Sequence, residues 1–209
     1  MARKGDGGRR QRQRRQQVQY EELDKYPVMP PHAFARIVRD LRTLNIIYQV
    51  IEPPLTKKEE EVRSEIMTIF IQALTADIEE IDANPELYLR AAMDQIIKSY
   101  RLKVNKKSRS KIFYYLKRDL IGYGRMDVLM NDANVEDVSL DGTNIPIFAY
   151  HRKFESVETT IAWPDDVELE SYVIKLAQRC GKHISVAEPL LDATLMDGSR
   201  IVMKLGREV

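Results

Sequence analysis

The spacing of apolar residues predicts two long helices in the first half of the chain. Thr56 and Glu59 have the spacing of a capping box, in which each side chain binds the backbone amide of the other residue. An apolar stripe then continues over about seven helical turns; it consists of Val62, Ile66, Ile69, Phe70, Ala73, Leu74, Ile78 and Ile81. Asn84 as N-cap and Pro85 at the first position predict the start of a second helix. The two helices are expected to belong to a helical bundle.

The residues before these helices show a weaker pattern. Residues 20–31 contain three prolines and are expected to form a loop. A short helix is expected next, because apolar residues occupy helical spacing at Phe34, Ile37, Val38, Leu41 and Leu44. Residues 45–52 (NIIYQVIE) read as a strand that the following two prolines end. These three segments and the two long helices together predict a mainly helical domain over residues 20–105.

The second half combines helices with short β-rich segments. Residues 110–121 are expected to form a helix, and strands are expected over residues 135–140, 145–150 and 157–163. The chain therefore has an expected α+β fold. A helical bundle is followed, after the basic connection at residues 101–111, by an α/β domain with an antiparallel sheet over residues 106–209.

Residues 164–209 predict a helix and a hairpin. The helix should begin at Pro164-Asp165-Asp166 and stop at Gly181. Residues 193–196 and 201–205 read as two strands around Asp197-Gly198, a strong hairpin turn signal. The last strand reaches Val209 in what reads as the middle of a hairpin, so we expect a fragment of a longer protein.

Composition indicates a globular protein of the cytoplasm. The 209 residues are 44% hydrophobic and 31% charged, which is typical of a globular chain. No apolar run is long enough to span a membrane, and the N-terminus lacks the apolar core of a signal peptide. The single cysteine, Cys180, excludes an internal disulfide and fits a reducing compartment.

Charge is distributed unevenly along the chain. Residues 1–19 hold seven Lys or Arg and one Asp, whereas the remainder is net acidic. Because this tail has almost no apolar residue, it is expected to be disordered. It is either a solvated tail or an arm that binds acidic lipid, nucleic acid or an acidic protein. Nucleic acid is disfavoured, because the tail lacks interleaved aromatic residues and the body is acidic.

Motifs for an autonomous active site are missing from the sequence. The Gly181-Lys182 pair lacks the spacing of a phosphate-binding P-loop, and no glycine-rich dinucleotide turn is present. His32, His151 and His183 lie too far apart to suggest a metal site, so no metal is expected. We expect no catalytic residue and no ATP hydrolysis by this chain alone.

Two arginines near the hairpin are the candidate binding residues. Arg200 follows the turn by two residues, and Arg207 comes just after Gly206. Guanidinium groups on a rigid hairpin suit a phosphate or carboxylate, which arginine binds in a planar, bidentate manner. Alternatively, Arg200 pairs with Asp192 or Asp197 across the hairpin and contributes little. Spacing alone favours this second interpretation.

Two segments resemble a known family. "NDANVEDVSLDGTNIPIFAYHRKFE" (residues 131–155) and "GKHISVAEPLLDATLMDGSRI" (residues 181–201) are similar to the N-terminal half of archaeal type II and type IV secretion ATPases, the motors of archaella and type IV pili. The resemblance covers roughly residues 111–209 and implies a PAS-like fold for that domain. It further implies that Arg200, and plausibly Arg207, contact the γ-phosphate of ATP bound with magnesium by a RecA-like motor domain. That motor domain is absent from this sequence.

The resemblance also implies partners and a location. The chain would be a non-catalytic part of a homo-hexamer at the cytoplasmic face of the cell membrane. It would contact its own motor domain, neighbouring subunits and a membrane platform protein. The alternative is a stand-alone adaptor or sensor module with a basic anchoring arm and no nucleotide role.

Overall fold

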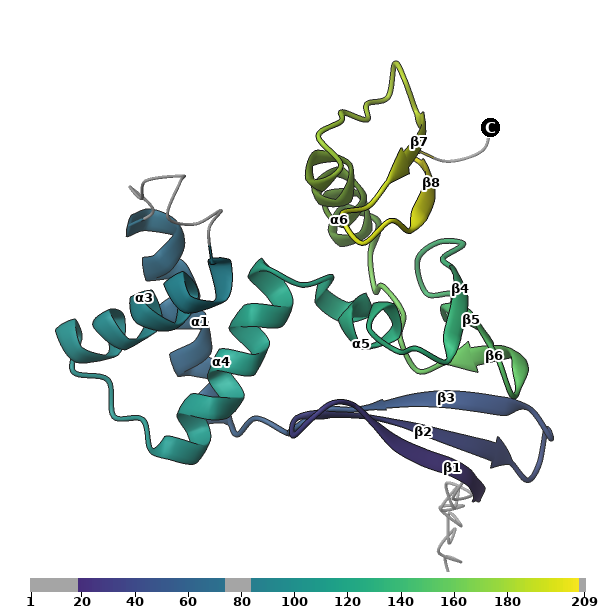
Figure 1. The fold of residues 1–209 in the computed structure, drawn as a ribbon, viewed down its shortest axis with the longest axis horizontal. Helices are drawn as coiled ribbons and strands as arrows, with labels where there is room; N and C mark the ends of the chain where they lie inside the picture. The colour runs from purple at the N-terminus through teal and green to yellow at the C-terminus, as the bar shows by residue number, and fades with distance from the viewer. Residues whose placement is uncertain (1–18, 74–83, 207–209) are drawn as a thin grey trace, which may run out of the picture.

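The computed structural model describes residues 19–73 and 84–206. Within these ranges the chain has an α+β fold, as predicted, with five α-helices, a six-stranded mixed sheet and a two-stranded sheet (Figure 1). In chain order the elements are β1 (Tyr20–Met29), β2 (Ala33–Asp40), β3 (Ile46–Ile51), α1 (Lys57–Ala73), α3 (Pro85–Ser99), α4 (Lys106–Leu120), the 3-10 turn η1 (Gly124–Met126), α5 (Asp127–Met130), β4 (Val135–Ser139), β5 (Phe148–His151), β6 (Glu155–Thr159), α6 (Asp166–Arg179), β7 (Leu190–Thr194) and β8 (Arg200–Lys204).

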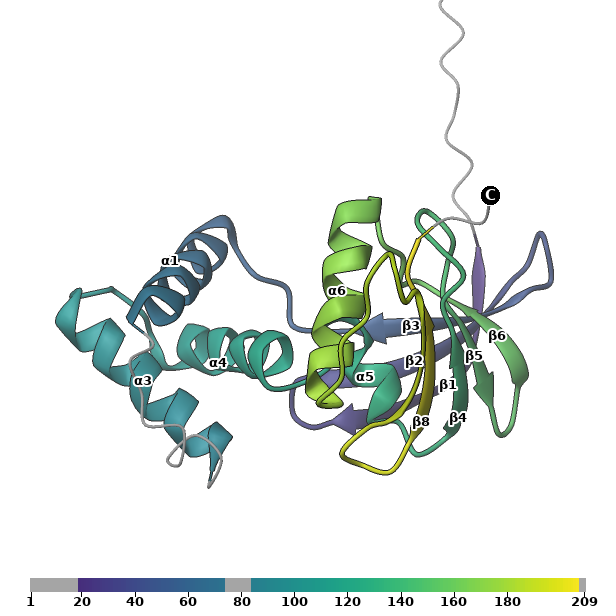
Figure 2. The same cartoon turned by 90° about the horizontal axis from the view of Figure 1, so that it is seen from above.

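The larger sheet joins strands that come before the helices α1, α3 and α4 with strands that follow them. Its strand order is β1-β2-β3-β6-β5-β4. Neighbouring strands are antiparallel except β3 and β6, which run parallel and pair Ile47 with Glu158 and Tyr48 with Thr159. The strands β1 to β3 therefore belong to the same sheet as β4 to β6, across the boundary expected near residue 105 (Figures 1 and 2).

The loop expected over residues 20–31 and the helix expected over residues 34–44 are wrong. These residues form the antiparallel pair β1 and β2 and the turns that follow each strand, so the described part of the chain begins with strands and not with a helical bundle. No residue of β2 is exposed, because β2 lies between β1 and β3. Ala35 and Ile37 are buried at alternate positions, and the adjacent Val38 is buried as well. Because apolar residues occupy two adjacent positions here, the sequence pattern resembles the spacing of a helix. Pro27 is tolerated because β1 is an edge strand, and Pro30 and Pro31 lie in the turn that leads to β2.

The helices α1, α3 and α4 pack together beside the sheet (Figure 1). The predicted capping box is confirmed: the Thr56 amide donates to Glu59 Oε2 at 2.8 Å, and the Glu59 amide donates to Thr56 Oγ1 at 3.3 Å. Asn84 Oδ1 likewise accepts from the Leu87 amide at 3.0 Å, which confirms the predicted start of α3. The predicted continuation of the α1 stripe through residues 74–81 lies outside the described residues. Helix α4 begins at Lys106, one turn earlier than expected.

The capping box makes the stability of α1 depend on pH. Hydrogen bonding from the Thr56 amide holds the pKa of Glu59 at about 2, below its ordinary value of 4.5. A carboxyl with a lowered pKa in the folded state stabilises above its unfolded pKa, and this contribution is lost as the pH falls from 4.5 toward 2. We expect Glu59→Gln to be less stable than the parent at neutral pH, with a difference that closes over this acidic range. Urea unfolding at a series of pH values measures it. Glu61→Gln, at an exposed position in the same turn, is the control and should show no such closure.

The second half of the chain follows the sequence prediction more closely. Strands β4, β5 and β6 fall within or next to the expected segments, and α6 begins after its N-cap Asp165 and is followed by Gly181. Trp163 is buried in the main core, with its ring 4.7 Å from that of Tyr172 on α6. None of the helices in the described ranges is long and apolar enough to cross a membrane.

Candidate binding groove

The hairpin of β7 and β8 packs against α6 by one face only. Its turn is at Asp197-Gly198, as predicted, and Gly198 has a φ of 90°, a conformation that glycine adopts readily. The inward side chains Ala193 and Met203 are buried, and Met203 packs in one cluster with residues of α6. Figures 1 and 2 place the hairpin beside α6, and Figure 1 shows it apart from β1 to β3. The other face of the hairpin is exposed.

Arg200 lies on this exposed face and is paired. Its Nε lies 3.1 Å from Asp192 Oδ1, and its Nη2 lies 2.5 Å from Asp192 Oδ2. The guanidinium group lowers the pKa of the Asp192 carboxyl by hydrogen bonding. Of the two partners weighed from the sequence, Asp192 is therefore the one that binds Arg200. The Arg200 side chain remains 76% exposed, so a further ligand can reach it. Arg207 lies outside the described residues.

A groove of about 710 Å³ runs beside β8. Val202, Lys204 and Leu205 line it from β8 and its end, and residues 140–145 line it from the connection between β4 and β5. The third side is α6, which contributes Leu169 and Val173 among others. The groove thus brings part of the first segment that carries the family resemblance next to residues that directly follow the second one. Sequence reasoning missed this, because only the fold places the 140–145 loop next to β8.

The groove combines an apolar surface with carboxylates. Asp141, Asp166 and Glu170 line it together with one cation, Lys204. Asp166 Oδ1 accepts from Thr143 Oγ1 at 2.6 Å, which ties the 140–145 loop to the start of α6. An excess of negative charge disfavours a phosphate inside the groove and favours a basic ligand. The side chains of the groove are therefore suited to binding a ligand.

A buried polar cluster lies on the larger sheet, away from the hairpin. Asp132 Oδ2 accepts from the hydroxyls of Tyr26 and Tyr48, each at 2.7 Å. His151 Nδ1 accepts from the Lys153 amide at 3.1 Å, so Nε2 carries the proton in the neutral ring and donates to the Tyr26 oxygen at 2.9 Å. Burial lowers the pKa of His151 and raises that of Tyr48. With all of these groups bound to one another, the cluster holds β1, β3 and β5 together around Asp132.

The other residues considered from the sequence do not line the groove. His32 Nε2 lies 3.0 Å from Ser110 Oγ, and His183 is exposed. Within the described residues, no group of three or more His, Cys, Asp or Glu side chains is placed to hold a metal ion. Asp165 Oδ1 accepts from the Glu168 amide at 2.8 Å and so caps the start of α6. Cys180 is half-buried at the end of α6.

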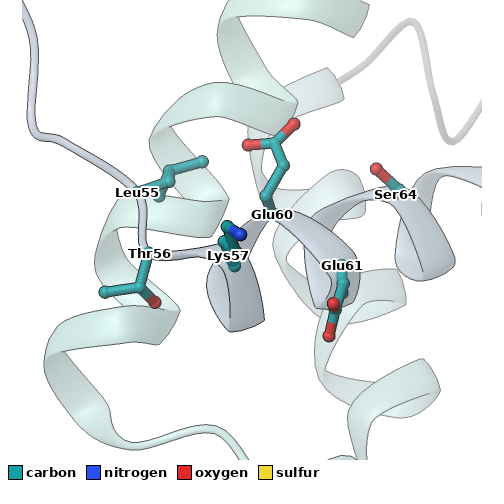
Figure 3. Close-up of a pocket in the computed structure, with 6 residues that line it drawn as sticks. All are labelled: Leu55, Thr56, Lys57, Glu60, Glu61 and Ser64. Carbon is teal, nitrogen blue, oxygen red and sulfur yellow. The ribbon is translucent and has the colours of Figure 1, made fainter.

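A second hollow lies at the start of α1 (Figure 3). Glu60, Glu61 and Ser64 line it together with residues 55–57. The carboxylates of Glu60 and Glu61 point to opposite sides, so the polar groups do not converge on one ligand position. Glu60 is moreover paired with Arg63 at 2.5 Å. This hollow is therefore a weaker candidate than the groove beside β8.

The chain is similar to three uncharacterized proteins of Methanocaldococcus jannaschii. It is 41% identical to MJ1288 over 163 residues, which are 78% of this chain and 65% of that protein. It is 33% identical to MJ0900 over 76% of this chain and 28% of that protein, and 38% identical to MJ0781 over 43% and 12%, respectively. The chain therefore spans less than two thirds of the length of each relative. No protein-family model matches it.

Proposed function

We propose that this chain is the N-terminal, non-catalytic portion of an archaeal secretion-type ATPase that assembles archaella or type IV pili. In this proposal, the region from β4 to β8 is a PAS-like domain of a homo-hexameric ring, and Arg200 contacts the γ-phosphate of ATP held with magnesium by a motor domain. Arg207 is the second proposed contact. The three-helix group formed by α1, α3 and α4 and the basic residues 1–19 then face a membrane platform protein and acidic lipid on the cytoplasmic side.

The observation that supports this proposal is the position of Arg200. Its guanidinium plane is held by the two oxygens of Asp192 on a hairpin that packs against α6, yet most of the side chain is exposed. An arginine that a second domain presents in a fixed orientation can neutralise charge on a transferring phosphoryl group. The match covers only 28% of MJ0900 and 12% of MJ0781, which agrees with a larger parent protein.

The test uses the native protein, whose intact mass and reading frame are determined first. We expect a longer product with a G-x-x-x-x-G-K-[S/T] segment after Val209. In that protein, Arg200→Ala should lower kcat for ATP hydrolysis at least about 100-fold, because such arginines stabilise transition-state charge. Arg152→Ala is the matched control, since Arg152 is also exposed and paired, with Glu136. A native product that ends at Val209, or equal kcat values for both variants, would refute the role and leave the adaptor alternative.

A further inference from the structure

Strand β8 has an open edge on the side away from β7, and this edge indicates a second binding role for the hairpin. The Leu205 amide donates to the Pro189 carbonyl and the Leu195 amide donates to the Ser199 carbonyl, both at 2.8 Å. Hydrogen-bonded and non-hydrogen-bonded pairs alternate along an antiparallel ladder. The Val202 N–H and C=O therefore point away from β7. Within residues 19–73 and 84–206, β8 pairs with no strand other than β7.

The two edges of the hairpin differ. On the β7 side, the Asp192 carbonyl accepts from Lys182 Nζ at 2.8 Å, so the segment after α6 covers this edge. On the β8 side, the edge faces the groove described above. A covered edge is protected from pairing with another chain, whereas an open edge is a template for it. Of the two edges of the hairpin, only the β8 edge is therefore open to pairing with a further strand.

The groove supplies contacts for the side chains of such a strand. Leu169 and Val173 of α6 line it beside β8, and Val202, which is 68% exposed, adds apolar surface at its rim. Side chains of an added strand alternate between two faces. One face would lie over α6 and the other would continue the exposed face of the hairpin. Alternating aliphatic residues therefore fit this position.

Charge distinguishes between the possible occupants. The carboxylates of Asp141 and Glu170 are exposed at the groove and favour a basic segment. A second copy of this chain is disfavoured. An antiparallel pair of two β8 strands centred on Val202 would place Arg200 of one copy opposite Lys204 of the other, and like charges directly opposite destabilise a strand pair.

We propose that the open edge of β8 binds an extended, basic polypeptide segment as an added strand. Main-chain hydrogen bonds to Val202 would hold the segment, and aliphatic residues at every second position would contact α6. Lysine or arginine between them would lie on the opposite face of the segment, and the negative charge of Asp141 and Glu170 around the groove would attract these cations. This role does not depend on ATP or on the proposed motor domain, and it assigns the groove to protein recognition.

The test is a titration of the full 209-residue chain, labelled with nitrogen-15, with a synthetic peptide TKIKVKIKT. The readouts are amide chemical shifts and the rate of hydrogen exchange at the Val202 amide. We expect saturable binding and slower exchange at Val202. The peptide TEIEVEIET keeps the aliphatic pattern with reversed charge, and it should bind at least about tenfold more weakly, because charge complementarity selects the partner. The peptide TKIKPKIKT keeps the charge but disrupts the strand, and it should not protect Val202.

Variants of the protein locate the site. Glu170→Lys should weaken binding of TKIKVKIKT and strengthen binding of TEIEVEIET, whereas Glu136→Lys, an exposed carboxylate on β4 that does not line the groove, should do neither. Equal binding of the proline peptide would reduce the interaction to charge alone and overturn the proposal. Unchanged exchange at Val202 would overturn it as well. Protection of Val202 in the free chain together with a dimeric mass would show that a second copy occupies the edge instead.

Discussion

Replacement of Asp132 by alanine is expected to lower the free energy of unfolding by about 3 kcal/mol, since each buried hydroxyl left without an acceptor costs about 1–3 kcal/mol. Asp132 Oδ2 accepts from both Tyr26 and Tyr48. Tyr48 is fully buried, so its hydroxyl has no access to water after the substitution and carries most of the cost. Asp132 Oδ1 also accepts from the Asn134 amide at 2.9 Å, which contributes to the loss. Urea unfolding followed by circular dichroism measures the change.

A double-mutant cycle separates this cost from a general loss of packing. Tyr48→Phe removes the donor, so adding Tyr48→Phe to Asp132→Ala should restore part of the stability instead of lowering it further. Removal of both partners leaves no unsatisfied hydroxyl from Tyr48. If the two effects add, the hydroxyl of Tyr48 does not depend on Asp132, and the role assigned to the carboxylate is wrong.

Arg118→Met is expected to lower the free energy of unfolding by about 3 kcal/mol, because breaking a buried ion pair leaves charges without compensation. Arg118 on α4 lies between Glu52, which follows β3, and Asp119, at 2.8 Å from a carboxylate oxygen of each. Its side chain is 15% exposed and lies over the Tyr115 ring. Glu52 also accepts from the Tyr114 hydroxyl at 2.7 Å. The substitution therefore disturbs the contact between the sheet and the three-helix group.

An exposed pair provides the control for Arg118. Arg152 lies 2.9 Å from Glu136, but both side chains are largely exposed. Arg152→Met should change the free energy of unfolding by no more than about 1 kcal/mol, because water screens an exposed pair. The measurement is the urea midpoint of the two variants at the same pH. Equal losses of stability for Arg118→Met and Arg152→Met would mean that the burial of Arg118 between the sheet and the three-helix group adds nothing to its contribution.

The features that were predicted correctly depend on residues close together in the sequence. The capping box at Thr56, the N-cap at Asn84, the helix start at Asp165 and the hairpin turn at Asp197 each involve contacts within a few residues. Such contacts form in much the same way in any surrounding structure. The pairing of Arg200 with Asp192 was also among the expected alternatives, because hairpin register places them near each other.

The features that were missed depend on contacts between distant residues. Tyr26 meets Asp132 across 106 positions, and Tyr26 itself lies in a segment that three prolines made look like a loop. The strand β2 looked helical because its burial is set by neighbours on both sides, not by its own periodicity. The groove beside β8 requires the 140–145 loop, α6 and the hairpin to be placed together. No local pattern carries that information.

The parallel pairing of β3 with β6 has a consequence for synthesis of the protein. Val50 and its hydrogen-bonding partner Thr160 are separated by 110 positions, so β1 to β3 leave the ribosome long before β6 exists. Until then, the edge of β3 is open and can pair with other chains. The helices α1, α3 and α4 emerge during this interval and can pack locally, because their contacts are close in sequence. Completion of the sheet is therefore the late step, and a ribosome that stalls within the helical segment would leave a nascent chain prone to aggregation.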